Sequence, residues 1–317
     1  MRTLLISTAL ILNAGMSAAQ VEFDGYGRFG LGYNEGRGGN DNLGDPFDSE
    51  LALVSRFRLN IEGKTNTDSG VQFSARVRLQ ADDSPNENEQ RSATLNGARY
   101  QVRYESFRMF VGNTGGAIDA GQFDGFEPGL EEFTGQYSGI EYDYLNDSST
   151  GAGSNAVLAE YIGSRLGVAA SYDPDVENGN DRWDVSVEYD FDGPFGVWAA
   201  YGENEDDQSL LVGVLTAEFD RLAVNVLLGK EDLNLAPGVP EIDGVVYGLS
   251  GRYEIGAATN LLFSYGSGEG SSDFEAYAIG FIHDLGGGVS LRGGIGSEGP
   301  KDGESEVTGD LGVWFNF

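Results

Sequence analysis

The sequence predicts an all-β protein whose strands form one transmembrane antiparallel β-barrel, and three observations lead to this prediction. Polar and apolar side chains alternate in many windows of the chain. Glycine accounts for 49 of 317 residues and aromatic residues for 11%, a composition of tight turns and pleated surfaces rather than of helices. Short and long links between the alternating windows follow each other regularly, as they do in barrels that cross a membrane.

The alternation has the period of a β-strand with one apolar and one polar face. Within residues 71–80, Phe73, Val77 and Leu79 share an apolar face, and the intervening Gln, Ser and Arg residues share a polar one. Residues 56–62 alternate in the same way. We therefore expect the apolar side chains to face lipid or a partner chain and the arginines to face water.

Sixteen windows meet the criteria for a strand, and an even number suits a single-chain bacterial barrel with a water-filled channel. They are residues 21–33, 49–63, 71–80, 98–105, 107–113, 156–162, 166–172, 183–191, 195–202, 209–219, 222–229, 245–253, 258–266, 274–284, 288–296 and 307–317. Residues 136–144 could also form a strand. Because each strand crosses the barrel once, a seventeenth strand at this point would place all later short links on the rim of the long links, and the reverse. Parity therefore assigns this stretch to a long third loop, residues 114–155.

The first nineteen residues have the order of a secretory signal peptide. Arg2 precedes an apolar run over 4–12, and Ser17-Ala18-Ala19 places small residues where a signal peptidase cuts. Cleavage after Ala19 would leave residues 20–317 as a single barrel domain. No later window has 18 or more uncharged apolar residues, so no transmembrane helix is expected in the mature chain.

The charge balance excludes several functions. With 51 acidic and 19 basic residues the formal net charge is −32, which argues against nucleic-acid binding and is compatible with a cation-favouring pore, bound cations or plain solubility. There is no cysteine, and His283 is the single histidine. The sequence around it has no nucleophile-elbow motif. We therefore expect no enzymatic activity. With only Lys64, Lys230 and Lys301, a lysine-lined anion pore is also disfavoured.

Three stretches carry a resemblance to a known family. They are residues 21–33 (VEFDGYGRFGLGY), residues 107–117 (FRMFVGNTGGA) and the C-terminal residues 312–317 (GVWFNF). Together with the strand layout they resemble the Gram-negative general porins, particularly the trimeric sixteen-stranded porins of alphaproteobacteria. The resemblance implies a homotrimer in the cell outer membrane, in contact with lipid and lipopolysaccharide. It also implies that the third loop folds into the lumen.

Seven arginines fall on the polar faces of the first four predicted strands. They are Arg28, Arg56, Arg58, Arg76, Arg78, Arg99 and Arg103. Adjacent strands lie about 4.8 Å apart, so these side chains would form one basic wall inside the barrel, as a selectivity site requires. The alternative is that each arginine lies on a solvated face or in a local ion pair.

The predicted third loop is acidic and rich in glycine. Its acids are Asp119, Asp124, Glu127, Glu131 and Glu132. In the family that the chain resembles, such a loop faces an arginine wall across a constriction, and the opposed charges orient dipolar solutes. The alternative is an external acidic loop. Glu141 and Asp143 in the same loop could bind Ca²⁺ through hard carboxylate oxygens, although the spacing matches no EF-hand.

Three further acidic clusters and the tryptophans are expected outside the channel interior or in packing. Acids at 82–83, 203–207 and 231–232 are expected on solvated outer loops, where they could also bridge lipopolysaccharide through divalent ions. Trp183, Trp198 and Trp314 are expected in an interfacial belt or in packing.

The sequence thus predicts a channel for passive diffusion of small hydrophilic solutes and ions, without a required cofactor. A solute-specific channel of the same fold is the first alternative. A soluble secreted β-sandwich that binds Ca²⁺ or carbohydrate is the second, and it would have to bury the outward apolar faces in a core.

Overall fold

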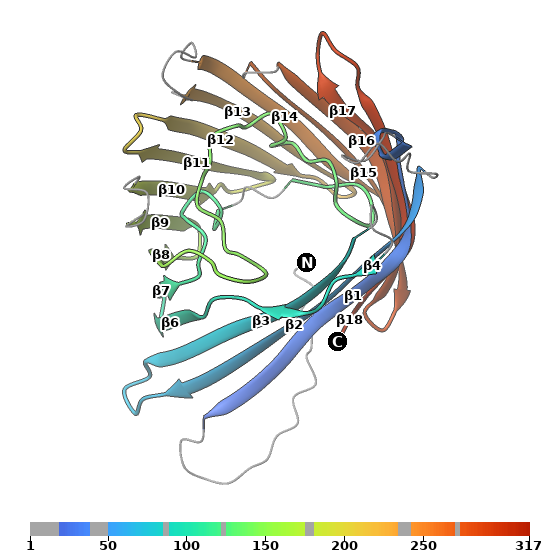
Figure 1. Cartoon of the computed structure of the whole chain (residues 1–317). Helices are drawn as coiled ribbons and strands as arrows, with labels where there is room; N and C mark the ends of the chain where they lie inside the picture. Colours follow the sequence, from blue (N-terminus) through green and yellow to red (C-terminus); the bar gives the residue numbers. More distant parts are fainter. Residues whose placement is uncertain are drawn as a thin grey trace.

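The computed structural model describes residues 19–38, 50–84, 89–121, 125–174, 181–233, 242–269 and 273–317. The predicted signal peptide therefore lies outside the described residues, apart from Ala19. Among the residues described, no helix is long and apolar enough to cross a membrane. Figure 1 shows the strands arranged as a ring around an open centre.

Eighteen strands and one short 3-10 helix, η1 (Glu35–Gly38), make up the described secondary structure. The strands are β1 (Gln20–Asn34), β2 (Leu51–Asn66), β3 (Gln72–Ser84), β4 (Glu89–Gln90), β5 (Thr94–Leu95), β6 (Arg99–Tyr104), β7 (Phe107–Gly112), β8 (Ala156–Ile162), β9 (Leu166–Asp173), β10 (Arg182–Asp190), β11 (Phe195–Asn204), β12 (Ser209–Glu218), β13 (Leu222–Leu233), β14 (Ile242–Ile255), β15 (Thr259–Gly268), β16 (Phe274–Gly286), β17 (Val289–Pro300) and β18 (Glu306–Asn316).

The sheet closes on itself. Neighbouring strands of the barrel wall pair antiparallel, with β3 pairing directly with β6, and β1 pairs with both β2 and β18, so the first and last strands seal the barrel. β4 and β5 are two residues long and pair only with the second half of β3. The remaining sixteen strands form the barrel wall, which confirms the predicted number and excludes a two-sheet sandwich.

Short turns join the strands at one rim. β6 and β7, for example, are linked by Glu105 and Ser106 alone, with Glu105 at φ 50°. Gly193 and Gly256 occupy other turns at φ 117° and 70°, a backbone region that glycine adopts without steric cost. The opposite rim carries the long links, of which residues 113–155 form the longest in the described chain. Residues 136–144 form no strand, in agreement with the parity argument.

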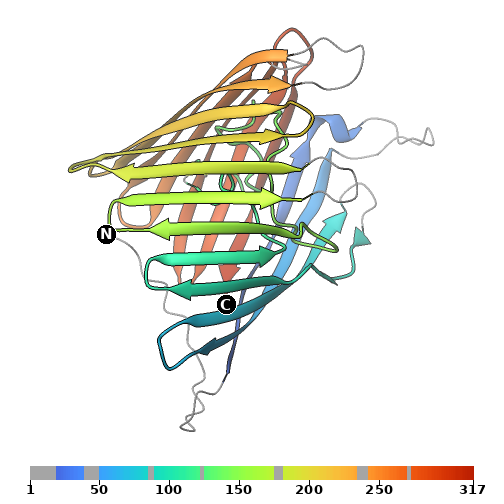
Figure 2. The same ribbon diagram turned by 90° about the vertical axis from the view of Figure 1, so that its left-hand side faces the viewer.

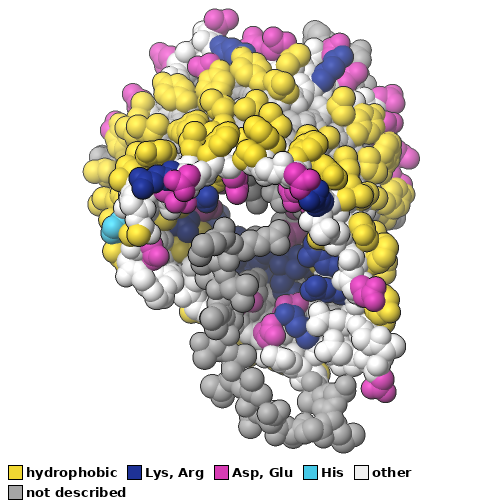
Figure 3. Space-filling model, turned by 180° about the vertical axis from the view of Figure 1, so that it is seen from behind, with side chains coloured by type: hydrophobic (Ala, Val, Ile, Leu, Met, Phe, Trp, Pro, Cys, Tyr) yellow, Lys and Arg dark blue, Asp and Glu magenta, His cyan; other side chains and the backbone are white. Residues whose placement is uncertain are grey.

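Side chains alternate between the two faces of the wall. In β9, Leu166, Val168 and Tyr172 are exposed, whereas Ala169 and Ser171 are buried. The exposed positions are apolar because they face outward, which is the reverse of a soluble protein and the rule for a barrel in lipid. Figure 3 shows hydrophobic side chains spread over the outside and Lys and Arg side chains gathered within the opening.

The strands of the barrel wall differ in length around its circumference. β6 and β7 have six residues each and β8 has seven, whereas β2 has sixteen and β14 has fourteen. Figure 2 faces this part of the barrel, where the short strands lie next to each other. A strand that crosses a bilayer needs about 9–11 residues. The stretch from β6 to β8 is therefore too short to span the hydrocarbon layer unaided.

Candidate functional site: the barrel interior

Residues 113–121 and 125–155 run inside the ring of strands (Figure 1) and are fixed there by carboxylates of the wall. Asp310 of β18 accepts hydrogen bonds from the backbone N–H groups of Leu130 at 2.7 Å and Glu131 at 2.8 Å. Glu231 of β13, which is fully buried, accepts bonds from the N–H groups of Glu141 and Tyr142, both at 3.0 Å. Each carboxylate thus satisfies two amides that would otherwise be buried without a partner.

Three wall serines bond the same segment at other points. Ser250 of β14 accepts the Phe126 N–H at 3.0 Å, and Ser264 of β15 donates to the Thr134 carbonyl at 2.7 Å. Ser171 of β9 accepts the Ala117 N–H at 2.9 Å. The described parts of the loop, residues 113–121 and 125–155, are therefore attached to widely separated strands of the barrel.

Glycines of the wall let the loop backbone approach closely. A Cβ on Gly248 of β14 would lie 1.9 Å from the carbonyl oxygen of Gln136. On β18, a Cβ on Gly312 would lie 2.5 Å from Cδ2 of Leu130. Side chains at these inward positions would displace the loop, so part of the high glycine content serves loop seating rather than turns.

One side of the interior, formed by β11–β14, packs against the loop through apolar side chains. Trp198, Leu210, Val212, Val214, Leu227, Leu233 and Val246 of the wall form one buried cluster with Ile118 and Tyr142 of the loop. We call this cluster the apolar seat. Trp198 is only 1% exposed, and a Cβ on Gly121 of the loop would lie 1.9 Å from its Nε1. Apolar contacts therefore attach the loop to this side of the wall.

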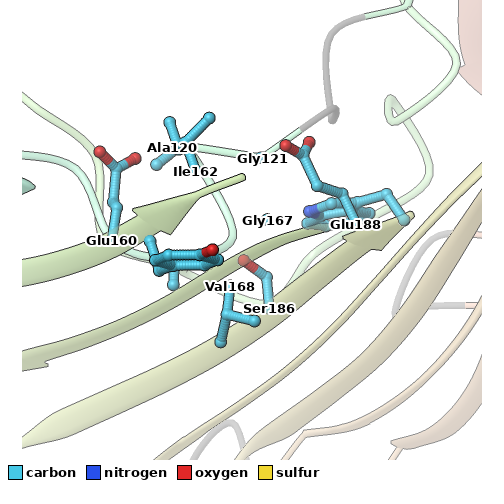
Figure 4. A pocket seen from close by; sticks show the side chains of 11 residues that line it. Ala120, Gly121, Glu160, Ile162, Gly167, Val168, Ser186 and Glu188 are labelled. Carbon is cyan, nitrogen blue, oxygen red and sulfur yellow. The ribbon is translucent and has the colours of Figure 1, made fainter. Parts of the chain in front are cut away.

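Figure 4 shows where the loop leaves the seat. Glu160 of β8 and Glu188 of β10 stand on the same side of the sheet as Ala120 and Gly121, while Val168 points to the opposite side. A cavity of about 30 Å³ lies between the loop and the wall here. Glu160 forms an ion pair with Arg108 of β7 at 2.9 Å.

The other side of the interior, formed by β1–β3, β6 and β17, carries the predicted arginines. Arg28 of β1 donates to the Leu130 carbonyl at 3.1 Å and pairs with the Glu131 carboxylate at 3.3 Å. Arg56 lies opposite Arg28 in the register of β1 and β2, and it pairs with Asp82 of β3. Loop acid and basic wall therefore meet directly here.

The next arginines meet the returning part of the loop. Arg76 and Arg78 of β3 pair with Asp147 at 2.8 and 3.4 Å. Arg58 of β2 and Arg78 both donate to Ser149 Oγ, at 3.0 and 2.7 Å. The structure thus brings Arg28, Arg56, Arg58, Arg76 and Arg78 onto one contiguous inner surface, together with Arg99, which lies opposite Arg76 and over the Phe110 ring. We call this surface the arginine side.

Arg103 differs from the other six predicted arginines. It is exposed and stands one residue before the end of β6, beside the short turn. It has the same inward parity as Arg99, but its strand neighbours are Gln72 and Arg108 at the rim. The structure therefore places it at the mouth of the barrel rather than among the arginines that meet the loop.

Two of the predicted loop acids contact arginines of the wall, and the others do not share this position. Glu131 pairs with Arg28, and Glu132, at φ 57°, pairs with Arg292 of β17 at 3.0 Å. Glu127 instead accepts a hydrogen bond from Tyr137 within the loop. Asp119 is exposed near Gly115, and Asp124 lies outside the described residues.

Burial raises the pKa of the Glu131 carboxyl, and the neighbouring Arg28 guanidinium opposes this effect. The Glu131 carboxyl is therefore protonated at a higher pH than an ordinary glutamate. Its protonation would leave Arg28 without its carboxylate partner.

Sequence reasoning missed several residues that hold this site. Arg292 lies on the last-but-one strand, far in sequence from the other arginines, and Asp147 and Asp310 gave no cluster signal. Glu231 was wrongly assigned to a solvated outer loop, because β13 extends to Leu233 and turns the side chain of Glu231 inward. Asp82 was likewise assigned to an outer loop but belongs to β3, where it pairs with Arg56.

Aromatic rings stand between arginines on this side. Tyr26 and Trp314 are stacked with ring centroids 4.2 Å apart, Arg58 lies over Tyr26 at 5.2 Å, and Arg292 lies over Trp314 at 4.0 Å. Trp314 and Trp198 are thus packing residues of the interior, while Trp183 is 41% exposed on the outward parity of β10. Cation–π contacts support the guanidinium groups without neutralising them.

The predicted calcium site gains no further ligands. Asp143 is 82% exposed and pairs with Arg182 at 3.3 Å, and Glu141 contributes its backbone N–H to Glu231. Within the described ranges, no group of three or more His, Cys, Asp or Glu side chains could hold a metal ion. Calcium binding at Glu141 and Asp143 stays a prediction, which calorimetry with CaCl₂ would test.

A closed sixteen-stranded barrel with an apolar outside and a charged inside defines a diffusion channel of the outer-membrane type. A sequence profile of the Gram-negative porins matches residues 7–302, and the chain belongs to this family. A porin of Fuscovulum blasticum is 30% identical over 313 residues, which cover 94% of this chain and 100% of the relative.

Solved structures agree with this assignment. A triple mutant of the Rhodopseudomonas blastica porin matches with a TM-score of 0.71 at 27% identity, and another mutant of that porin matches with 0.72 at 24% identity. Both matches cover 94% of this chain and 100% of the other. The protein is an outer-membrane porin, a channel through which small solutes diffuse.

Proposed function

We propose that the arginine side and the acidic loop together set the solute preference of this channel, which passes small hydrophilic solutes and favours cations over anions. The observation that carries the proposal is the contact of Glu131 with Arg28 and of Glu132 with Arg292. These ion pairs set acidic groups of the loop beside basic groups of the wall, and the local field of the paired charges orients dipolar solutes and disfavours apolar ones. The net charge of −32 supports the preference for cations.

Planar-bilayer recording tests this proposal. The purified protein should give ohmic steps in KCl, with a reversal potential on the cation side in a salt gradient. Replacing Glu127, Glu131 and Glu132 together by Gln should weaken the cation preference and leave assembly intact. Asp192→Asn is the matched control, since Asp192 is an exposed acid in a short turn. An unchanged reversal potential in the triple variant would refute the role of the loop acids.

A solute-specific channel of the same fold is the alternative. The hydrogen bonds that Arg58 and Arg78 both donate to Ser149 support it, because they fix two side chains of the lumen at one point. The two functions differ in their flux. Diffusion rises linearly with solute concentration, whereas a specific site saturates. Liposome swelling over a range of solute concentrations separates them.

We further propose that the porin is a homotrimer whose subunits meet at the short wall of β6–β8. These strands cannot span the bilayer alone, yet their outward residues are apolar, among them Tyr104, Phe107, Met109 and Tyr161. A groove of about 400 Å³ lies between these side chains. A second copy of the chain would cover this face and complete the hydrophobic thickness.

Cysteine cross-linking tests the interface, because the chain has no cysteine of its own. Met109→Cys should form cross-links between subunits, and Leu228→Cys should not, because Leu228 is 63% exposed on the long strand β13. Trimers that cross-link through position 228 and not through 109 would place the interface elsewhere.

We also propose that residues 1–19 are a signal peptide that is removed during export. Mass spectrometry of the protein isolated from membranes should find Gln20 as the first residue. We propose no catalytic activity, since the single histidine, His283, bonds Thr259 Oγ1 at 2.8 Å on β15 and β16. Lipopolysaccharide is the proposed neighbour of the outer loops.

A further inference from the structure

The side chain of Asn96 joins the arginine side to the returning part of the loop. Asn96 lies between β5 and β6, is only 7% exposed, and forms an isolated parallel bridge with Gly151. Its Oδ1 accepts the backbone N–H of Arg78 at 2.7 Å, and its backbone N–H donates to the Arg78 carbonyl at 2.9 Å. Its Nδ2 donates to the Ser148 carbonyl at 2.6 Å. One residue thus bonds strand β3 and the loop at the same time.

Asn113, at the beginning of the loop, binds the same residue from another direction. It is 1% exposed, and its backbone N–H donates to the Ala98 carbonyl at 3.0 Å. Its Oδ1 accepts the Ser148 N–H at 2.9 Å, and its Nδ2 donates to the Ser148 carbonyl at 2.8 Å. Both backbone groups of Ser148 are therefore bound by side-chain amides. We call Asn96 and Asn113 the asparagine clamp.

The chemistry of the clamp requires asparagine. An amide side chain offers donors and an acceptor together, whereas a carboxylate of the same shape offers acceptors only. The space around the clamp is also small. A Cβ on Gly153 would lie 2.0 Å from Asn113 Oδ1, and a Cβ on Gly97 would lie 3.2 Å from Asn113 Cβ. The clamp therefore holds Ser148 in one position, without room for the loop to shift locally.

The residue that precedes Ser148 is Asp147, whose carboxylate meets two arginines of β3. It lies 2.8 Å from Arg76 and 3.4 Å from Arg78. An aspartate has few staggered rotamers, so its carboxylate has few possible positions once the adjacent backbone is fixed. Asn96 bonds the backbone of Arg78 as well as that of Ser148, so it fixes both partners of one ion pair.

We propose that Asn96 and Asn113 are positioning residues for ion selectivity, which hold Asp147 against Arg76 and Arg78 and so determine how much positive charge the arginine side presents to permeating ions. The inference rests on the proposed function, because it takes the cation preference as the property that is set. A carboxylate at contact distance offsets much of a guanidinium charge, and one released into salt solution is screened from it. The two neutral amides therefore act on selectivity through the charge of Asp147.

Reversal potentials in a KCl gradient test the clamp. Asn96→Ala and Asn113→Ala should each lower the ratio of potassium to chloride permeability roughly twofold, because the arginines lose a unit charge from contact distance. Asp147→Asn should lower the ratio in the same way. The decisive variant combines Asn113→Ala with Asp147→Asn. It should match Asp147→Asn alone, since two changes that act through one carboxylate do not add.

A second variant disturbs the clamp without removing an amide. Gly153→Ala places a methyl group against Asn113 Oδ1 and should shift the reversal potential in the same direction as Asn113→Ala. Asn146→Ala is the matched control, because Asn146 is an exposed asparagine of the same loop that donates to the Tyr144 carbonyl. It should behave like the parent. Heat-modifiable migration on a gel shows which variants have folded, and Gly153→Ala decides alone if the two alanine variants of the clamp do not fold.

The outcomes separate this inference from the proposed function. Folded clamp variants with the parental reversal potential would overturn the inference, and so would parental selectivity in Asp147→Asn. A further loss of cation preference in the double variant would also overturn it, because the clamp would then act by a route other than Asp147. In each of these cases the proposed function stands. Absence of cation preference in the parent would instead count against the proposed function.

Discussion

The loop rests on apolar side chains where it meets β11–β14, whereas it meets arginines where it faces β1–β3 and β17. Burial of large apolar groups fixes the first contact and makes it insensitive to salt and pH. Ion pairs and hydrogen bonds form the second contact, which responds to both salt and pH. The apolar contacts on one side of the lumen therefore hold the loop in position. On the other side, the ion pairs bring the charges of the loop next to the arginines.

The largest effect is expected from Trp198, at the centre of the apolar seat. Trp198→Ala should destabilise the folded barrel by about 3–5 kcal/mol, the usual cost of removing a buried aromatic side chain. The loop should also become mobile, so single-channel current should be noisier. The measurement is the temperature at which compact gel migration is lost.

Trp183→Ala provides the control, because Trp183 is an outward, 41% exposed tryptophan on the adjacent strand. It should change current noise little. If both variants behaved alike, the seat would have no special role in holding the loop.

A second, smaller effect is expected where the loop backbone approaches the wall. Gly248→Ala adds a methyl group that would lie 1.9 Å from the Gln136 carbonyl, and such overpacking costs about 1–3 kcal/mol. Gly213→Ala on β12 is the control, since its Cβ would make an ordinary 3.6 Å contact. Equal melting temperatures for the two variants would show that the loop yields easily.

The sequence pattern predicts the inward residues of the arginine side but not those of the apolar seat. Arginines stand out on a polar strand face, so Arg58 and Arg76 could be assigned inward from alternation alone. Val212 and Leu227 could not, because an inner apolar face next to an outer apolar face leaves no alternation to read. The loop supplies the missing partner, and only the fold shows which inner residues it covers. The role of Asp147 cannot be predicted from the sequence either, because its ion-pair partner Arg76 lies 71 residues away in the chain.

The arginine side should control selectivity without controlling stability. Replacing Arg56, Arg76 and Arg99 by Ser removes the ion-pair partner of Asp82 and leaves Asp147 paired with Arg78 alone. The ratio of potassium to chloride permeability should rise on the order of threefold, as expected for screened charges in water. Reversal potentials in a KCl gradient measure this ratio.

Arg165→Ser, in an exposed turn at the rim, is the control for charge removal far from the loop. It should leave the reversal potential where it is in the parent. A triple variant with parental selectivity would contradict the assignment of these arginines to the aqueous path.

The smallest effect concerns pH. Burial raises the pKa of Glu131 against the influence of Arg28, so its carboxylate is charged above this raised pKa and neutral below it. As the pH falls, cation preference should begin to decline before an ordinary glutamate would titrate. Glu131→Gln should remove this early part of the decline, and a variant with the parental pH profile would exclude Glu131 as its source.

Deletion of residues 121–132 tests the central claim, that the loop crossing the lumen sets the narrowest part of the channel. The deleted stretch includes Leu130 and Glu131, which join the loop to Arg28 and Asp310, while Ile118 and Tyr142 of the apolar seat remain. The variant should still show heat-modifiable migration and insert into bilayers, because the wall closes through β1 and β18 without the loop. Its single-channel conductance should exceed that of the parent. A variant that folds and inserts but conducts like the parent would contradict the account.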